Sequence, residues 1–460
     1  MAWLGSLLWA IALLVIQNYL SARKVGLPIR VIPISHTSPF WMLVDRRVLH
    51  VIKQIPFFGN SGFTRYNYRA WELADRYYSH AEMGDAFILV TPGRNWLYVA
   101  DPEALMDIFR RRTDFPRCLE LTEVINVFGP NISTVDGPQW KMQRKMTASC
   151  FNEPNNGIIS KKSVDSVAQD TRTLSLHVLS RAGFGNPSIS YKDSLQPILE
   201  NCVLIMALGP KIRERAWWLL RYLRNLCSSF QAYMTTQYEE EKRAFSQGSG
   251  LADRNLMKSL VRASQEEAAA GSSGLTENEI YGNMFVLNFA GHDTTAHTFT
   301  QWHYNADFPR LKRCLSIMLE TLRLYTPVPV AKWTDKEARQ LNVGDKTVVI
   351  PPSTMVIPNS LTWHPSRWIT ASESTATEHG SEDLIIPRRG TFLGWSEGSR
   401  DCPGRKFSQV EFRFNPVTEP GETIDDAIQR TLHQIETDSA PVLLLQMLHP
   451  ERAPLVWSRR

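Results

Sequence analysis

The sequence predicts a mainly α-helical protein with a small β region. Stretches with helical periodicity fill most of the chain, the longest over 211–247, whereas only 86–100 and 341–358 have strand patterns. Hydrophobic residues make up 43% and charged residues 21%, close to a globular average, which excludes a disordered or fibrous chain. No repeat and no clear domain boundary interrupt 36–460, so we expect one domain there.

The N-terminus has the pattern of a membrane anchor. Residues 1–22 carry no charged side chain, and Arg23 and Lys24 follow directly. A membrane-spanning helix needs about 20 mostly apolar residues, and flanking positive charge stays in the cytoplasm. We therefore expect a single-pass anchor over 1–22 in the endoplasmic reticulum membrane, a proline-containing hinge over 23–35, and a cytosolic body. A cleaved signal peptide and a peripheral apolar tail are the alternatives; the segment lacks the charged start and clean cleavage site of a signal peptide.

Local patterns place the elements of the body in order. Helices are expected over 66–80, from Asp101-Pro102 onward, and over 137–151, 161–182 and 310–325; a hairpin is expected from Phe87–Thr91 and Trp96–Ala100. Thr276 and Glu279 form a capping box that begins an apolar helix. The chain from 359 to 405 is mostly loop.

Cysteine content, charge and missing motifs exclude several classes of protein. The six cysteines have neither CxxC pairs nor zinc-type spacing, which excludes a disulfide scaffold: Cys118, Cys150, Cys202, Cys227, Cys314 and Cys402. A net charge of +5 is too weak to indicate nucleic acid and fits an acidic protein partner or a membrane surface. No dinucleotide or phosphate-binding glycine motif is present, so redox chemistry would need electrons from another protein.

The strongest functional signal is the loop Trp395-Ser-Glu-Gly398-Ser-Arg400-Asp-Cys402-Pro-Gly404. Gly398 and Gly404 let the backbone approach a flat ligand, and backbone amides with a nearby cation favour a thiolate at Cys402. Arg400 offers several donors for a carboxylate. A glycine-rich turn around an ordinary free cysteine is the alternative.

This loop resembles the heme-binding loop of the cytochrome P-450 family, the heme-thiolate monooxygenases. The resemblance implies that Cys402 is the axial thiolate and the metal ligand of heme b (iron protoporphyrin IX), with Arg400, Gly398 and Gly404 in the heme-binding loop. Tryptophan at 395 and proline after the cysteine are similar to fungal microsomal members.

The apolar helix carries a second motif, Ala290-Gly-His-Asp-Thr-Thr295. Glycine and paired threonines are locally unfavourable inside a helix, and positions 290 and 294 share one face. The motif resembles the oxygen-activation segment of the family, which implies that Thr294 is the catalytic alcohol and Asp293 its acidic neighbour. A threonine that only bonds back to a helix carbonyl is the alternative.

Two further resemblances concern heme binding and the structural network. Trp140 and Arg144 match a tryptophan and arginine that hold a heme propionate in the family. Glu320 and Arg323 match its ExxR pair, and Arg367 matches the third member of that network; alone, the Glu/Arg pair would indicate only a surface ion pair.

Charge near these motifs suggests a partner. The family resemblance would place Lys141, Arg144, Lys145, Arg405 and Lys406 near the cysteine side of the heme, and such a basic patch suits an acidic reductase. Scattered surface charge is the alternative.

The chain departs from the family at three places. Only 26 residues separate Thr294 from Glu320, the segment from Asn359 to Trp368 is short, and the helix after Cys402 ends at Asn415-Pro416. Parts of the central, post-central and C-terminal helices are therefore expected to be missing.

Together these patterns indicate a membrane-anchored heme-thiolate monooxygenase that inserts one oxygen atom of dioxygen into a lipophilic small molecule. By resemblance, NADPH–cytochrome P-450 reductase supplies the electrons, and fungal secondary metabolism is the setting; membrane lipid is a further partner, and nucleic acid is not. The alternatives are a rearrangement or dehydration enzyme of the same fold, and a truncated, catalytically silent heme or scaffold protein.

Overall fold

The computed structural model describes residues 2–35, 38–56, 61–68, 71–75, 77–151, 195, 197–198, 201, 205, 221–247, 255–271, 274–295, 319, 322, 331–359, 389–406, 408, 439–441 and 445–447. The chain divides into two compact units. The first unit contains 1–118 and 319–401, and the second contains 119–318 and 402–460.

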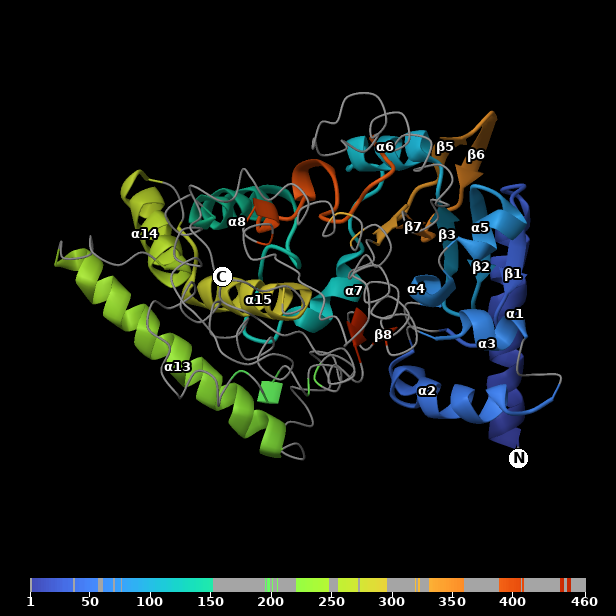
Figure 1. The fold of residues 1–460 in the computed structure, drawn as a ribbon, viewed down its shortest axis with the longest axis horizontal. Coiled ribbons are helices and arrows are strands. Elements are labelled where there is room, and N and C mark those ends of the chain that lie inside the picture. Colours follow the sequence, from blue (N-terminus) through green and yellow to red (C-terminus); the bar gives the residue numbers. More distant parts are fainter. Residues whose placement is uncertain are drawn as a thin grey trace, which may run out of the picture. The chain divides into compact units, whose positions relative to one another are not determined.

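The first unit is built on a five-stranded sheet with strand order β1-β2-β3-β7-β4 (Figure 1). Its strands are β1 (Ile29–Val31), β2 (Ala86–Val90), β3 (Asn95–Val99), β4 (Lys332–Trp333) and β7 (Met355–Pro358). The predicted hairpin is confirmed as antiparallel β2 and β3, and β7 joins β3 in parallel. Every residue of β2 and β3 is buried, as their largely apolar sequences lead one to expect.

The N-terminal segment forms the helix α1 (Ala2–Arg23). Its C-terminal end packs on the sheet, because Ala22 is fully buried and Asn18 donates from Nδ2 to the carbonyl oxygen of Thr91 at 2.9 Å. Among the residues that the structure describes, no helix is long and apolar enough to cross a membrane, so the expected single-pass span is not supported. β1 lies inside 23–35, the range expected to be a hinge, and pairs with β2 in parallel.

Short helices complete the first unit: α2 (Pro39–Lys53), α3 (Gly62–Tyr66), α4 (Trp71–Asp75), α5 (Tyr78–Met83) and α6 (Pro102–Arg110). The predicted start of α6 is confirmed, since Asp101 is its N-cap and accepts a hydrogen bond from the Ala104 backbone nitrogen at 2.6 Å. The continuous helix expected over 66–80 is wrong. Asp75 instead accepts a hydrogen bond from the backbone nitrogen of Ser79 at 2.9 Å, which satisfies a donor in the first turn of α5.

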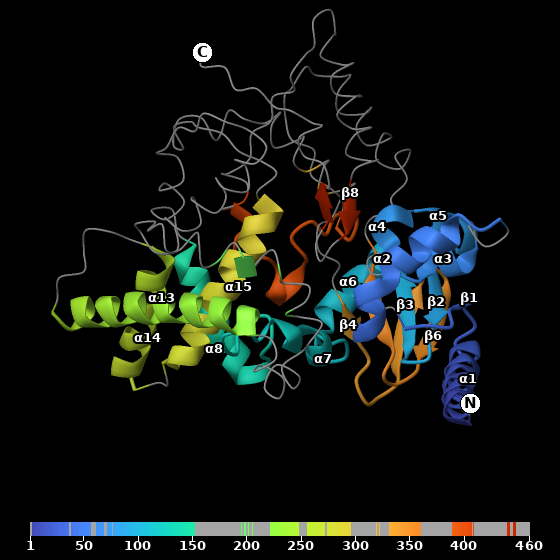
Figure 2. The same ribbon diagram turned by 90° about the horizontal axis from the view of Figure 1, so that it is seen from below.

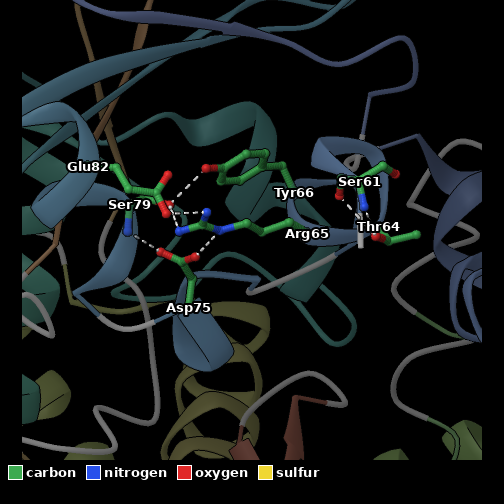
Figure 3. A network of polar contacts seen from close by, with 7 residues as sticks. All are labelled: Ser61, Thr64, Arg65, Tyr66, Asp75, Ser79 and Glu82. Carbon is green, nitrogen blue, oxygen red and sulfur yellow. Dashed lines mark hydrogen bonds and ion pairs between the residues drawn. The ribbon is translucent and has the colours of Figure 1, made fainter. Parts of the chain in front are cut away.

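A polar network joins α3 to α4 and α5 (Figure 3). The guanidinium of Arg65 donates to Asp75 Oδ1 at 2.5 Å, to Glu82 Oε1 at 2.7 Å and to Ser79 Oγ at 3.1 Å. The hydroxyl of Tyr66 lies 3.0 Å from Ser79 Oγ. Arg65 therefore ties together three short helices that have few turns of their own.

The expected β region near 350 is also confirmed. Strands β5 (Arg339–Val343) and β6 (Lys346–Ile350) form a separate antiparallel hairpin. Its turn uses Gly344 at φ +54°, a conformation that glycine adopts without strain. A short 3-10 turn, η5 (Gly398–Arg400), follows later in the chain of the first unit, after β7.

The second unit is largely helical. Its elements are α7 (Leu119–Thr122), the 3-10 turn η1 (Glu123–Ile125), α8 (Gly137–Cys150), α13 (Arg221–Ser246), α14 (Leu256–Ala269), α15 (Glu277–Thr295), β8 (Ser439–Pro441) and β9 (Leu445–Met447). α14 packs against α8, α13 and α15 (Figure 2). Phe128 belongs to the core, with its ring 5.4 Å from that of Phe230 and 5.1 Å from that of Phe285.

The start of α15 matches the predicted capping box. The backbone nitrogen of Glu279 donates to Thr276 Oγ1 at 3.3 Å, and the backbone nitrogen of Thr276 donates to Glu279 Oε2 at 2.9 Å. The helix then runs through Ala290 to Thr295, so the second sequence motif lies in its last turns.

Other expectations fall outside the described residues. These are the helix over 161–182, all but Leu319 and Leu322 of the helix over 310–325, and the three regions where the chain is expected to be shortened. They stay predictions.

Candidate functional site

The sulfur-bearing part of the cysteine loop lies in the second unit. Cys402 is exposed and forms no disulfide, and its carbonyl oxygen accepts a hydrogen bond from the Arg405 backbone nitrogen at 3.3 Å. A Cβ built on Gly404 would lie 3.8 Å from the sulfur of Cys402 and 3.6 Å from Phe151 Cε1. Phe151 is the residue that ends α8, so the loop passes beside the C-terminal end of that helix.

The part of the loop before the cysteine lies in the first unit. Trp395 is buried, and its ring lies 5.8 Å from that of Phe392. Gly398 has φ +77°, and a Cβ there would approach the carbonyl oxygen of Phe109 to 3.4 Å. Gly398 thus has a left-handed conformation that favours glycine, and the half-buried Arg400 ends the η5 turn.

The expected propionate-binding pair lies on α8. Asp136 is the N-cap of this helix, and its side chain accepts a hydrogen bond from the Gly137 backbone nitrogen. Trp140 is 5% exposed and Arg144 is half-buried, one helical turn further along. Their spacing places an indole and a guanidinium on neighbouring positions of one helix face.

The expected oxygen-activation residues lie in the last turns of α15. Asp293 and Thr294 are helical, and position 294 shares a helix face with position 290. Glu320, Arg323 and Arg367 lie outside the described residues, so the ExxR network stays a prediction.

The donor set suits a heme held by a thiolate. Cys402 is exposed and forms no disulfide, and Gly404 lies beside its sulfur. Arg144 adds a guanidinium, a group that pairs well with carboxylates such as the heme propionates. The residues present therefore fit the group that the loop motif implies.

A buried polar network between α8 and α15 has no counterpart in the sequence predictions. Gln143 is fully buried, donates from Nε2 to Glu279 Oε1 at 3.0 Å, and accepts at Oε1 from Asn283 Nδ2 at 3.0 Å. Gln139 also donates to Glu279 Oε1, at 2.7 Å. The capping box identifies Glu279 from the sequence, but no local signal identifies its partners on α8.

The hydrogen bonds determine the charge of Glu279. Burial raises the pKa of its carboxyl group, but hydrogen bonds from Gln139, Thr276 and Gln143 together lower it more, so the net pKa lies below the ordinary value. Glu279 is therefore a carboxylate at neutral pH, with both oxygens accepting hydrogen bonds.

Comparisons with known proteins agree with the sequence motifs. The cytochrome P-450 family model matches residues 216–304, which contain α13, α14 and α15. A cytochrome P-450 monooxygenase of Arthrobotrys oligospora is 24% identical over 567 aligned positions, which cover 95% of this chain and 94% of the relative. A second, from Postia placenta, is 26% identical and covers 89% and 91%. A third, from the phomenoic acid biosynthesis cluster of Leptosphaeria maculans, is 23% identical and covers 90% and 91%.

The alignment with the Arthrobotrys protein is longer than the 460 residues of this chain, so that relative has residues with no counterpart here.

Solved structures agree on the fold. The heme domain of a cytochrome P-450 mutant aligns with a TM-score of 0.55 and 16% identity, over 74% of this chain and 84% of its own. A cyanobacterial cytochrome P-450 with bound retinoic acid gives 0.51 and 14%, over 73% and 83%.

Proposed function

We propose that this chain, which belongs to the cytochrome P-450 family and is a monooxygenase, holds heme b through the thiolate of Cys402 and oxidises a lipophilic small molecule. One oxygen atom of dioxygen enters the substrate and the other leaves as water. The exposed Cys402 sulfur, with Gly404 against it and the end of α8 beside it, is the observation that supports the proposal.

The proposed function assigns separate roles in heme binding and catalysis to individual residues. When bound, the heme supplies dioxygen activation, and a thiolate ligand favours cleavage of the O–O bond. Cys402 would be the ligand, Trp140 and Arg144 would hold a propionate, and Arg400 would offer donors to a carboxylate. Thr294, with Asp293, delivers protons toward the oxygen site, a role that general acids perform with a gain of about 10²–10⁴-fold.

The electrons would come from NADPH–cytochrome P-450 reductase. Four exposed cations of the second unit support this proposal: Lys141, Lys145, Arg405 and Lys406. An acidic partner would be steered to such a surface, and salt would weaken the encounter. Charge reversal at Lys406 should slow reduction at low ionic strength and change it little at high ionic strength.

We also propose that α1 attaches the chain to the cytosolic face of the endoplasmic reticulum membrane. The support is a set of exposed apolar side chains on that helix: Trp9, Leu13, Leu14, Ile16 and Leu20. Apolar residues on one helix bind the headgroup and acyl boundary without crossing it. Replacing Leu13 and Leu14 by serine should release the protein from microsomes on carbonate washing, and unchanged retention would contradict the attachment.

Glycosylation can test the topology, although not at the N-glycosylation sequon Asn131-Ile-Ser133. Asn131 is fully buried, and its Nδ2 donates to the carbonyl oxygens of Ile125 and Gly129 and to Asn126 Oδ1. Its missing glycan would therefore say nothing about topology. The substitution Asp345→Asn creates a new sequon, completed by Thr347, in the exposed β5–β6 turn. A cytosolic body predicts no glycan there, and a glycan would place the turn in the lumen.

The substrate class rests on the relatives. The Leptosphaeria protein belongs to a biosynthesis cluster, which supports a role of this chain in fungal secondary metabolism. The test is incubation with reductase, NADPH, labelled dioxygen and a panel of lipophilic fungal metabolites. One labelled oxygen atom in a product confirms the proposal, whereas a product formed without NADPH would indicate a rearrangement enzyme of the same fold.

A catalytically silent heme or scaffold protein is the second candidate. The observation in its favour is that the Arthrobotrys relative has residues that this chain lacks. Failure to take up heme during expression with added heme precursor would favour this candidate, and heme uptake with product formation would exclude it.

A further inference from the structure

We propose that Gln143 is a positioning residue that sets the rotation of α15 against α8, and so aligns the heme-holding face of one helix with the oxygen-activating face of the other. This inference rests on the proposed function, since it assigns a role within that site. Four hydrogen bonds around Gln143 and Asn283, together with the geometry of the two helices, support it.

The first step is the directionality of the contact. The Gln143 amide donates to Glu279 Oε1 and accepts from Asn283 Nδ2, each at 3.0 Å, so one side chain binds two consecutive turns of α15. Asn283 is itself held on both sides. Its Nδ2 also donates to the Glu279 carbonyl oxygen at 2.8 Å, and its Oδ1 accepts from the Ile132 backbone nitrogen at 2.9 Å.

The second step is burial. Gln143 and Asn283 are completely buried, and Glu279 is 5% exposed. A rotation of α15 would leave a buried carboxylate or amide without its partner, which costs about 1–3 kcal/mol for each unsatisfied group and more for a charged one. The network therefore favours one rotational orientation of α15 about its axis and makes other orientations less stable. Apolar packing alone would discriminate less between these orientations.

The third step joins the network to the site. On α15, positions 279, 283, 290 and 294 follow one another at intervals that keep them on the same side of a helix. On α8, Gln143 is adjacent to Arg144 and three residues after Trp140. By holding the first turns of α15, the network thus determines how the helix face with positions 290 and 294 is oriented relative to α8, which carries the propionate-binding pair.

Exchanging the side chains of Gln143 and Glu279 provides the sharpest test. Gln143→Met removes both hydrogen bonds at similar length, and Gln143→Glu sets two carboxylates against each other. The double variant Gln143→Glu with Glu279→Gln restores the contacts in reverse, because the new carboxylate accepts from Asn283 and from the new amide. Gln139→Met is the control, since Gln139 is exposed and donates to the same Glu279 oxygen without contacting Asn283.

Two measurements distinguish a positioning role of Gln143 from a merely stabilising one. Product formed per NADPH consumed, at equal heme content, should fall by about tenfold in both single Gln143 variants, since small misplacements of reacting groups cost up to about 10²-fold. It should recover in the double variant and change little in the control. Amide hydrogen exchange over 286–295, measured without turnover, should quicken in the single variants and recover in the exchange variant.

Two results would overturn the inference. One is coupling that stays unchanged in both single variants while the urea midpoint falls, which would make Gln143 a purely stabilising residue. The other is unaltered hydrogen exchange over 286–295 in every variant. Failure of the proposed function has a different signature: the wild type itself would lack heme or product, while the exchange measurement would still decide whether Gln143 orients α15.

Discussion

Gly282 of α15 lies against the backbone of Gly129, so close that a Cβ on residue 282 would be 2.4 Å from the Gly129 carbonyl oxygen. A Cβ there would also lie 2.6 Å from the carbonyl oxygen of Pro130. The loop before α8 and the N-terminal half of α15 therefore pack backbone to backbone. This contact places Asn283 within reach of the Ile132 amide.

The contact predicts that Gly282→Ala is destabilising although alanine favours helices. Overpacking of this kind costs roughly 1–3 kcal/mol, more than the gain of up to about 1 kcal/mol in helix propensity. Gly62→Ala in α3 is the matched control, because a Cβ there meets only Tyr66 at ordinary contact distance. Urea unfolding of both variants gives the comparison, and equal midpoints for the two would contradict the close packing.

A second prediction concerns pH and the buried carboxyl group of Glu72. Burial raises its pKa from 4.5 to about 7, and the charge of Asp75 adds to the increase. The pKa in the folded state thus exceeds that in the unfolded state, so folding favours the protonated form. The stabilising effect of the bound proton is complete below pH 4.5 and is lost as the pH rises through 7.

Glu72→Gln should remove the loss of stability that accompanies deprotonation of Glu72 at higher pH. Above pH 7 the variant should be more stable than the wild type by up to about 3 kcal/mol, and the difference should vanish near pH 4. The measurement is the unfolding free energy of both proteins from pH 4 to pH 8. A difference independent of pH would show that the Glu72 carboxyl group does not titrate as its burial indicates.

The Arg65 network predicts unequal roles for its two carboxylates (Figure 3). The Asp75 side chain is 4% exposed, whereas that of Glu82 is 47% exposed. Asp75→Asn weakens a charge-assisted bond to a buried acceptor and should cost roughly 1–3 kcal/mol. Glu82→Gln affects a solvated pair and should cost no more than about 1 kcal/mol. Thermal unfolding measures both, and a larger effect at Glu82 would contradict the assignment.

Local signals in the sequence predict much of this fold. The caps at Asp101 and Thr276 mark the starts of α6 and α15, because a cap depends on residues within one helical turn. The turn at Pro92-Gly93 joins two apolar runs into the hairpin of β2 and β3. α14 was missed although Asn255 caps it, accepting a hydrogen bond from the Lys258 backbone nitrogen at 2.8 Å.

Long-range contacts explain what the sequence did not predict. The parallel pairing of Trp96 with Met355 joins distant segments, and no local pattern specifies it. The same holds for Gln143, whose partners on α15 follow it by more than a hundred residues in the chain. Motif resemblance predicts roles for Cys402 and Thr294, but it gives no sign of the hydrogen bonds between α8 and α15.

The oxygen step gives a further prediction. Thr294→Ala should retain heme and substrate binding but divert electrons to peroxide, because an alanine cannot deliver a proton. If Thr294 is the general acid, product should fall by about 10²–10⁴-fold. NADPH consumption, product and peroxide are measured together, with Thr295→Ala as the neighbouring control. Unchanged coupling in the Thr294 variant would remove this residue from the mechanism.

The most direct test of the heme-thiolate assignment is the carbon monoxide difference spectrum of the reduced, purified protein. We predict a red-shifted Soret band, typical of a thiolate-ligated heme, its loss in Cys402→Ser, and its retention in Cys118→Ser, Cys150→Ser and Cys227→Ser. Those three cysteines are buried, whereas Cys402 is exposed. A thiolate band that persists in Cys402→Ser, or a wild type that binds no heme, would contradict the account.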